Sequence, residues 1–95
     1  MALKKLAVGE ELDFGFNWTD WLETNNESIA TSSWDVPSGL TRGDEINDGS
    51  TTGVFLSGGT EGVLYEVPNT IVTDAAIPRT AVRTLRILIV SKKVK

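Results

Sequence analysis

Short runs of apolar residues with a period of two, separated by turn sequences, constrain the fold of this chain more than any other feature. The clearest run alternates apolar residues with polar residues or glycine over residues 12–18, which predicts a strand with one buried face. Residues 82–90 are rich in β-branched side chains and predict another strand. Further strands are expected over residues 28–36, 40–46, 51–56 and 63–72. Roughly six or seven strands at these spacings predict a small all-β antiparallel sandwich with Greek-key connections.

Particular residues indicate where these strands bend or end. Asp48-Gly49 is a hairpin signal. Ile29 and Trp34 fall on opposite parities of their strand, so burying both requires a β-bulge between them. Pro68 has no N–H to donate to a ladder, which predicts that its strand lies at a sheet edge or carries a bulge.

Helical periodicity is almost absent. Residues 3–6 and 20–23 hint at it, but both stretches are too short to predict a helix. We therefore expect one core between two sheets, formed by the apolar residues of the strand pattern. These residues are Phe16, Trp18, Trp34, Tyr65, Ile71, Leu85, Ile87 and Ile89.

Composition excludes most enzyme chemistry. The 95 residues contain no cysteine and no histidine, which removes disulfides, thiolate nucleophiles, the usual zinc ligands and the common general base. The acidic turn at residues 44–49 resembles a calcium loop, but Ile46 and Phe55 occupy two positions that need oxygen ligands. We expect no catalysis, no cofactor and no metal. We also expect no membrane span and no secretory signal, because the longest run of large apolar residues covers only 87–90.

Charge is distributed unevenly along the chain. Residues 1–78 hold all thirteen acids and three basic residues, a net charge of −10, whereas residues 79–95 hold six basic residues and no acid. Basic strips bind nucleic acid in other proteins. Here the acidic body would repel phosphate, so we expect Arg79, Arg83 and Arg86 to pair across a sheet or with a protein partner.

Sequence segments outside the strand pattern are candidates for contacts between proteins. Residues 1–9 are predicted to be an N-terminal arm, residues 10–91 the sandwich domain and residues 92–95 a basic tail. Terminal segments that the core does not need are free to dock on neighbouring chains. The candidate contact residues are Leu3, Leu6, Val8, Trp21, Arg79, Arg83 and Arg86.

Several stretches resemble a family of small phage virion proteins described as fibre-tail adaptor or structural proteins. They are residues 12–22, with the double-tryptophan segment, 29–40, 56–65, with the Ser-Gly-Gly-Thr loop, and 69–73. The resemblance implies an immunoglobulin-like β-sandwich in a virion and no catalysis. With the glycines of the loop, it also implies that Tyr65 is a corner residue whose hydroxyl bonds to backbone near residues 58–62. Pro68 and residues 75–82 depart from the family pattern.

The function that follows is that of a non-enzymatic virion protein, made in the host cytoplasm, that joins or reinforces larger virion proteins. The first hypothesis is a tail, neck or fibre adaptor, and the alternative is a capsid decoration protein. Its partners would be tail, neck, fibre or major capsid proteins, in a homo-oligomer or multi-copy assembly, without nucleic acid or membrane. A carbohydrate-binding module that recognises a host-surface sugar is the rival of another class, and it would need Trp21 or another aromatic ring exposed.

Overall fold

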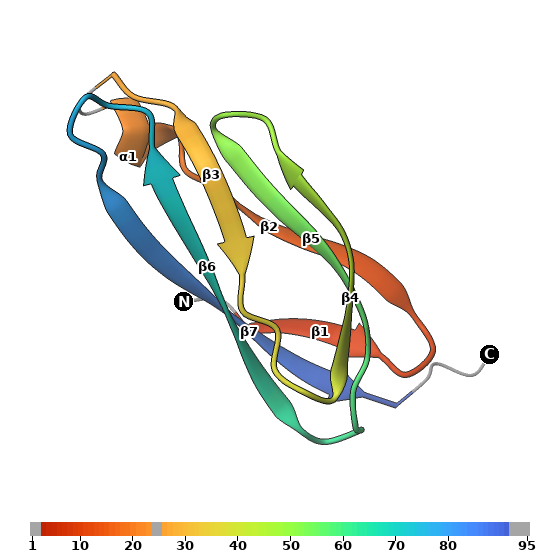
Figure 1. The fold of residues 1–95 in the computed structure, drawn as a ribbon. Coiled ribbons are helices and arrows are strands. Elements are labelled where there is room, and N and C mark those ends of the chain that lie inside the picture. Colours follow the sequence, from red (N-terminus) through yellow and green to blue (C-terminus); the bar gives the residue numbers. More distant parts are fainter. Residues whose placement is uncertain (1–2, 24–25, 92–95) are drawn as a thin grey trace.

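Seven strands and one short helix make up the part of the chain that the computed structural model describes, residues 3–23 and 26–91 (Figure 1). In chain order they are β1 (Leu3–Ala7), β2 (Glu11–Asn17), α1 (Thr19–Glu23), β3 (Ile29–Trp34), β4 (Leu40–Asn47), β5 (Thr51–Gly58), β6 (Leu64–Thr73) and β7 (Thr80–Val90). The predicted basic tail at residues 92–95 lies outside the described residues.

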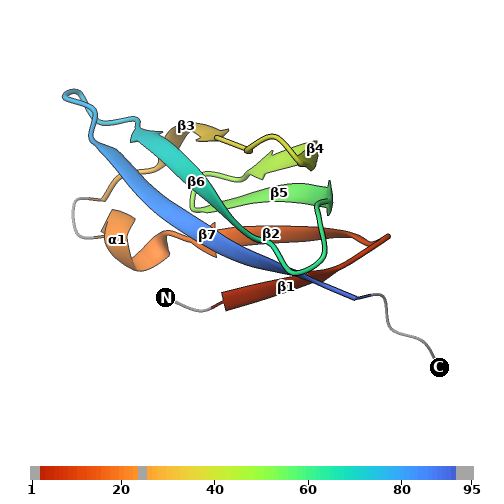
Figure 2. The ribbon, with the colours of Figure 1, turned by 90° about the horizontal axis from the view of Figure 1, so that it is seen from below.

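The strands form two sheets, which Figure 2 shows as separate layers. One sheet has the order β1-β7-β6-β3 and the other the order β2-β5-β4, and every pairing is antiparallel except β1 with β7. The chain changes sheet at four of its connections, as a Greek key requires. The sets β2-β5-β4 and β3-β6-β7 correspond to the two sheets of immunoglobulin domains, and β1 joins the second set. The predicted all-β immunoglobulin-like sandwich is confirmed.

Strand β1 corrects the expectation that residues 1–9 form an arm outside the strands. Leu3–Ala7 pair in parallel with β7, and Leu6 lies beside Ile89 with none of its surface exposed. The pattern missed this strand because only one of its five residues is buried and two of them, Lys4 and Lys5, are charged and exposed. Residues 3–7 therefore contribute to the core.

The core lies between the sheets and agrees closely with the predicted set. Six of the eight predicted residues are buried, and Phe16 and Tyr65 are partly buried and pack against the same clusters. The Phe16 ring stacks on Trp34, with centroids 6.0 Å apart, and meets Trp18 edge-on at 6.2 Å. These three rings connect the two hydrophobic clusters into one continuous core.

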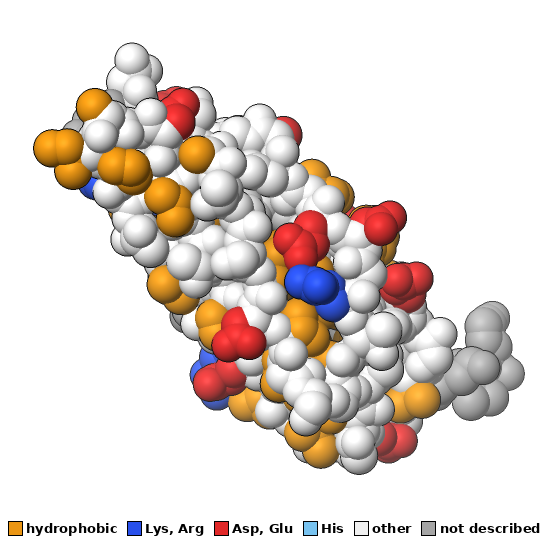
Figure 3. All heavy atoms as spheres, viewed as in Figure 1, with side chains coloured by type: hydrophobic (Ala, Val, Ile, Leu, Met, Phe, Trp, Pro, Cys, Tyr) orange, Lys and Arg blue, Asp and Glu red, His pale blue; other side chains and the backbone are white. Residues whose placement is uncertain are grey.

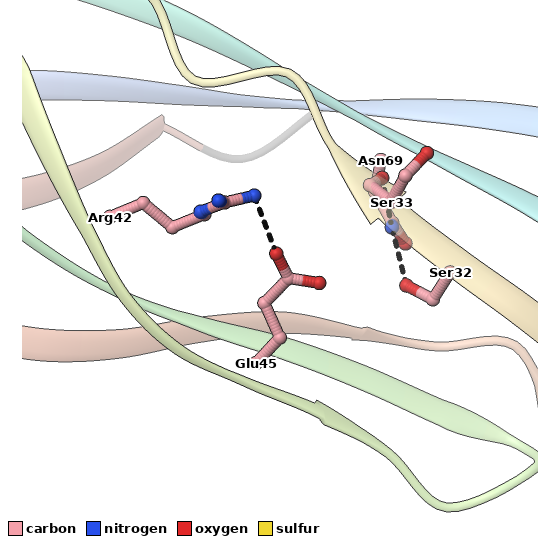
Figure 4. A network of polar contacts seen from close by, with 5 residues as sticks. All are labelled: Ser32, Ser33, Arg42, Glu45 and Asn69. Atoms are coloured by element: carbon pink, nitrogen blue, oxygen red, sulfur yellow. Dashed lines mark hydrogen bonds and ion pairs between the residues drawn. The ribbon is translucent and has the colours of Figure 1, made fainter.

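A buried polar network crosses the core. The Trp18 indole Nε1 donates to Thr52 Oγ1 at 3.1 Å and to Asn69 Oδ1 at 3.3 Å. The Asn69 amide nitrogen donates to Ser32 Oγ, as Figure 4 shows, and to the Ser33 carbonyl, both at 3.0 Å. Thr52 Oγ1 also donates to Asn69 Oδ1 at 2.6 Å. Both the oxygen and the nitrogen of the Asn69 amide are therefore hydrogen-bonded, which a buried polar group requires. Because Thr52 belongs to β5 and Asn69 to β6, the network joins the two sheets.

Pro68 lies in an inner strand, so the predicted edge strand is wrong. Strand β6 pairs with β7 on one side and with β3 on the other. The Pro68 carbonyl accepts from the Asp35 N–H at 3.0 Å, just beyond the last residue of β3. Since N–H and C=O of a strand residue point the same way, the missing donor faces the place where β3 ends and costs little. The bulge predicted between Ile29 and Trp34 is present next to Ile29.

Tyr65 forms the predicted corner. Its hydroxyl oxygen accepts a hydrogen bond from the Thr60 N–H at 3.1 Å, in the loop between β5 and β6. Gly39 lies directly under the ring, and a Cβ there would be 3.0 Å from the hydroxyl oxygen. Gly39 also has a φ of +105°, which glycine adopts at low cost. The corner thus depends on a glycine of a different connection.

Helix α1 is one turn long, in the stretch that was judged too short to predict a helix. Its Leu22 N–H donates to the Trp18 carbonyl, and the Leu22 side chain is 2% exposed between Trp18, Ile29 and Ile71. Tertiary burial of Leu22 stabilises a turn that would not persist alone. No helix within residues 3–23 and 26–91 has the length and apolar character needed to cross a membrane.

Candidate protein interface

Three connections meet at one end of the sandwich, which we call the loop end and define as residues 18–23, 26–28, 47–50 and 74–79 (Figure 1). Backbone hydrogen bonds hold the connections together. The Trp18 N–H donates to the Ser50 carbonyl and the Ile29 N–H to the Gly49 carbonyl, both at 2.8 Å. The Asp74 N–H donates to the Ser28 carbonyl at 3.0 Å. The loop end is therefore a connected surface and not three independent loops.

Two of the predicted contact residues, Trp21 and Arg79, meet at the loop end. The Arg79 guanidinium carbon lies 4.3 Å from the centroid of the Trp21 ring, and its Nε lies 3.1 Å from Glu27 Oε1. Trp21 also meets Trp18 edge-on, with centroids 5.7 Å apart. Half-buried Trp21 is thus packed between the core and an arginine. One face of its ring is covered by the Arg79 guanidinium.

Arg83, the next predicted contact residue, covers the core from the same side. Its guanidinium carbon lies 4.1 Å from the centroid of the Trp18 ring, and its Nη1 donates to the Asn17 carbonyl at 3.2 Å. This placement helps to reduce the exposure of Trp18 to 1%. Arg83 therefore has a structural role in this chain.

Arg86 lies further along β7, opposite Glu66 of β6 in the strand register. Its Nε is 3.6 Å from Glu66 Oε2, and both side chains are largely exposed. The expected pairing of strand arginines with acids across the sheet is confirmed for this residue. Arg83 and Arg86 of β7, and Arg79 just before it, are therefore all engaged in contacts within the chain.

The three predicted contact residues of the N-terminus separate into two groups. Leu6 is fully buried and is not available to a partner, which corrects its assignment as a contact residue. Leu3 and Val8 are 49% and 38% exposed. Both lie on or next to β1, which forms the outer edge of its sheet. An edge strand presents unpaired backbone groups to another chain, although Lys4 and Lys5 discourage indiscriminate pairing.

Sequence reasoning missed the large apolar residue that is the most exposed within residues 3–23 and 26–91. Ile77, in the β6–β7 connection, is 86% exposed, whereas the other exposed large apolar side chains lie between 38% and 57%. In Figure 3 hydrophobic side chains gather at this end of the molecule. The available signal was an isoleucine in a turn between Ala76 and Pro78, where no strand pattern requires one.

The acidic turn between β4 and β5 binds its own backbone. The Asp48 carboxylate accepts from the Ser50 N–H at 3.1 Å and from the Thr51 N–H at 2.8 Å. These hydrogen bonds, with the Ser50 bond contributing most, hold the pKa of Asp48 below its usual value. Among the described residues no group of three or more acidic side chains is placed to hold a metal ion.

The opposite end, which we call the far end, carries its own apolar residues. Val8, Val63 and Leu64 are each about two-fifths exposed, at 38%, 39% and 41%. Backbone hydrogen bonds to the end of β7 bring them near each other, because the Val8 N–H donates to the Val90 carbonyl and the Ile89 N–H to the Val63 carbonyl. The molecule measures 50 × 23 × 20 Å, so the two ends are well separated.

Comparison with known proteins identifies a family for this chain. The model of a protein family described as podophage GP4 fiber-tail adaptor protein gp77 matches residues 7–88 of the chain. This range runs from the last residue of β1 to Leu88, near the end of β7, and includes both ends of the sandwich. No curated protein matches the chain.

Proposed function

We propose that this chain, which belongs to the podophage GP4 fibre-tail adaptor protein family, joins a fibre protein to the phage tail through the two ends of its elongated sandwich. The family describes structural adaptors of the virion, and an adaptor binds other virion proteins. We further assign one partner to each end of the sandwich. The exposed apolar residues and the placement of the charged residues support this assignment.

The observation that carries the proposal is the separation of two exposed apolar regions on a rod-shaped molecule. Ile77 is exposed at the loop end, and Val8, Val63 and Leu64 are exposed at the far end. Exposed apolar groups that gather at one place on a protein surface mark sites of association. Two such places on opposite ends of a 50 Å rod suit a protein that bridges two partners.

The placement of the charged residues supports protein partners. Arg79, Arg83 and Arg86 contact acids, aromatic rings or backbone within the chain, so these three guanidinium groups are less available to phosphate. We accordingly propose that the protein works without nucleic acid and without catalysis. We also propose that several copies act together, because a domain of 95 residues has a thin stability margin that association would increase.

The same geometry gives no support to carbohydrate binding. A sugar platform needs an aromatic face open to solvent. Trp18 and Trp34 are 1% and 4% exposed, and one face of Trp21 is covered by Arg79. No observation favours capsid decoration over the adaptor role.

Reconstitution tests the proposal. Tail complexes and fibre protein from the same phage, each purified without this chain, are mixed with and without it, and assembly is followed by mass photometry. We expect the fibre protein to join the tail complex only when the chain is present. Attachment of the fibre at the same level without the chain would contradict the adaptor role.

A further inference from the structure

The β6–β7 connection at the loop end is built as a rigid projection with an apolar tip. The Thr73 N–H donates to the Arg79 carbonyl, and the Arg79 N–H donates to Thr73 Oγ1, both at 2.9 Å. These two bonds close a loop of residues 74–78 at its base. The tip of that loop is Ile77, flanked by Ala76 and Pro78.

The base of the loop is attached to its surroundings on more than one side. Asp74 and Ser28 exchange two hydrogen bonds of 3.0 Å, one through the backbone and one through the Asp74 carboxylate. Arg79 packs on the Trp21 ring and pairs with Glu27, whose side chain is only 10% exposed. An exposed residue on a fixed base loses little conformational freedom on binding, which is the condition for a high-affinity contact.

The exposure of Ile77 has no explanation within the chain. Folding leaves 86% of the side chain in water, and Pro78 restricts the backbone on its C-terminal side. A loop that served only to connect two strands would gain solubility from a polar residue there. A convex apolar tip is buried by a concave apolar surface, so its complement is a recess in another protein.

Charges around the tip indicate what borders that recess. The loop end contains five acidic residues and one arginine, which is paired with Glu27, and the Arg83 guanidinium of β7 lies over its Trp18, so acidic residues outnumber the arginines there. The acidic residues are Asp20, Glu23, Glu27, Asp48 and Asp74. A surface of opposite sign is the complementary partner, because like charges brought together at an interface are costly.

We propose that Ile77 is an anchor residue that inserts into an apolar recess, bordered by lysine or arginine, on one of the two virion proteins that the adaptor joins. The proposal rests on the proposed function and adds to it the contact residue and the chemistry of the partner surface. In this proposal Ile77 contacts the partner protein. Trp21, Arg79 and Arg83 support the loop end and do not bind the partner themselves.

The test compares substitutions at both ends of the molecule. Ile77→Ser removes the apolar tip, Ile77→Leu keeps it, and Leu64→Ser removes an apolar side chain of the far end. Binding of each variant to purified tail complexes and to purified fibre protein is measured by biolayer interferometry. We expect Ile77→Ser to weaken binding to one of the two by about tenfold or more and to leave the other unchanged. Ile77→Leu should bind both within about threefold of the unsubstituted chain.

Leu64→Ser should retain the binding that Ile77→Ser loses, which separates the tip from exposed apolar residues in general. The affinity that depends on Ile77 should also fall as sodium chloride rises from about 50 to about 500 mM, because salt screens charges at the rim. The melting temperature of Ile77→Ser should stay unchanged, since the side chain makes little contact with the fold.

Equal binding of both proteins by Ile77→Ser and by the unsubstituted chain would overturn the anchor. Equal losses in Ile77→Ser and Ile77→Leu would also overturn it, because the contact would then not be apolar packing. Failure of the unsubstituted chain to bind either the tail complex or the fibre protein would instead contradict the proposed function. The two failures are therefore distinguishable.

Discussion

Thr52 Oγ1 donates a hydrogen bond of 2.6 Å to Asn69 Oδ1 across the interior, between the two sheets of the sandwich. Both residues have no exposed surface. The oxygen that accepts this bond also accepts from the Trp18 indole, so the positions of Thr52 and Trp18 both depend on the orientation of one amide. A buried polar group that is fully hydrogen-bonded specifies the alignment of the elements it joins.

Replacing Asn69 should therefore be costly. Asn69→Ala leaves the Trp18 Nε1 with one partner and the Ser33 carbonyl without its side-chain donor, and it also leaves a cavity. We expect a loss of at least about 2 kcal/mol in the free energy of unfolding, measured by urea denaturation. Thr70→Ala, at the next and partly exposed position of β6, is the control and should change it by less than about 0.5 kcal/mol. Equal effects of the two substitutions would show that the network does not contribute.

Strand β1 provides a second matched pair. Leu6 is fully buried and Leu3 is 49% exposed on the same strand. Leu6→Ala should reduce the free energy of unfolding by about 2–5 kcal/mol, whereas Leu3→Ala should change it by less than about 0.5 kcal/mol. Thermal denaturation followed by circular dichroism distinguishes the two. If both variants melt like the unsubstituted chain, residues 1–9 are a dispensable arm after all.

The tyrosine corner makes a smaller contribution. Tyr65→Phe removes only the hydroxyl that accepts from Thr60, and the ring remains packed over Gly39. We expect a loss of about 0.5–1.5 kcal/mol in the free energy of unfolding, with an unchanged circular dichroism spectrum. A variant as stable as the unsubstituted chain would mean that water replaces the hydroxyl at no cost.

Asp48 should give the β4–β5 turn a pH dependence. Its pKa is lowered in the folded chain, because the Ser50 and Thr51 N–H groups favour the ionised carboxylate. The stabilisation is thus present above the pKa of the unfolded chain and is lost as the pH falls through the lower folded value. Melting temperatures of the chain and of Asp48→Ala should differ at pH 6 and converge as the pH falls well below the ordinary aspartate pKa of about 3.9. A difference that persists unchanged at low pH would contradict this origin.

The sequence predicted the strands whose side chains alternate between core and solvent. Residues 12–18 carry that alternation because β2 has one face on the core, and β7 was evident from its β-branched residues. Trp34 was placed in the core correctly because the core needs large side chains, and the opposite parity of Ile29 indicated the bulge. In each case the pattern of one segment reports the burial of that same segment.

The features that escaped prediction depend on other parts of the chain. Strand β1 exists because Leu6 meets Ile89, which is distant in sequence, and Pro68 is tolerated because β3 ends opposite its ring. Of the candidate contact residues, Trp21 and Arg79 are neighbours in the structure, but their positions in the sequence did not predict this contact. Ile77 was overlooked because periodicity says nothing about a connection, where exposure is set by the position of the surrounding loops.

A cryo-electron microscopy reconstruction of the assembled virion tests the central claim most directly. The account predicts density for the sandwich between the fibre and the tail, with its 50 Å axis bridging the two and Ile77 enclosed by one of them. Density for the sandwich on the capsid shell, or in contact with only one virion protein, would contradict the adaptor role proposed for this chain.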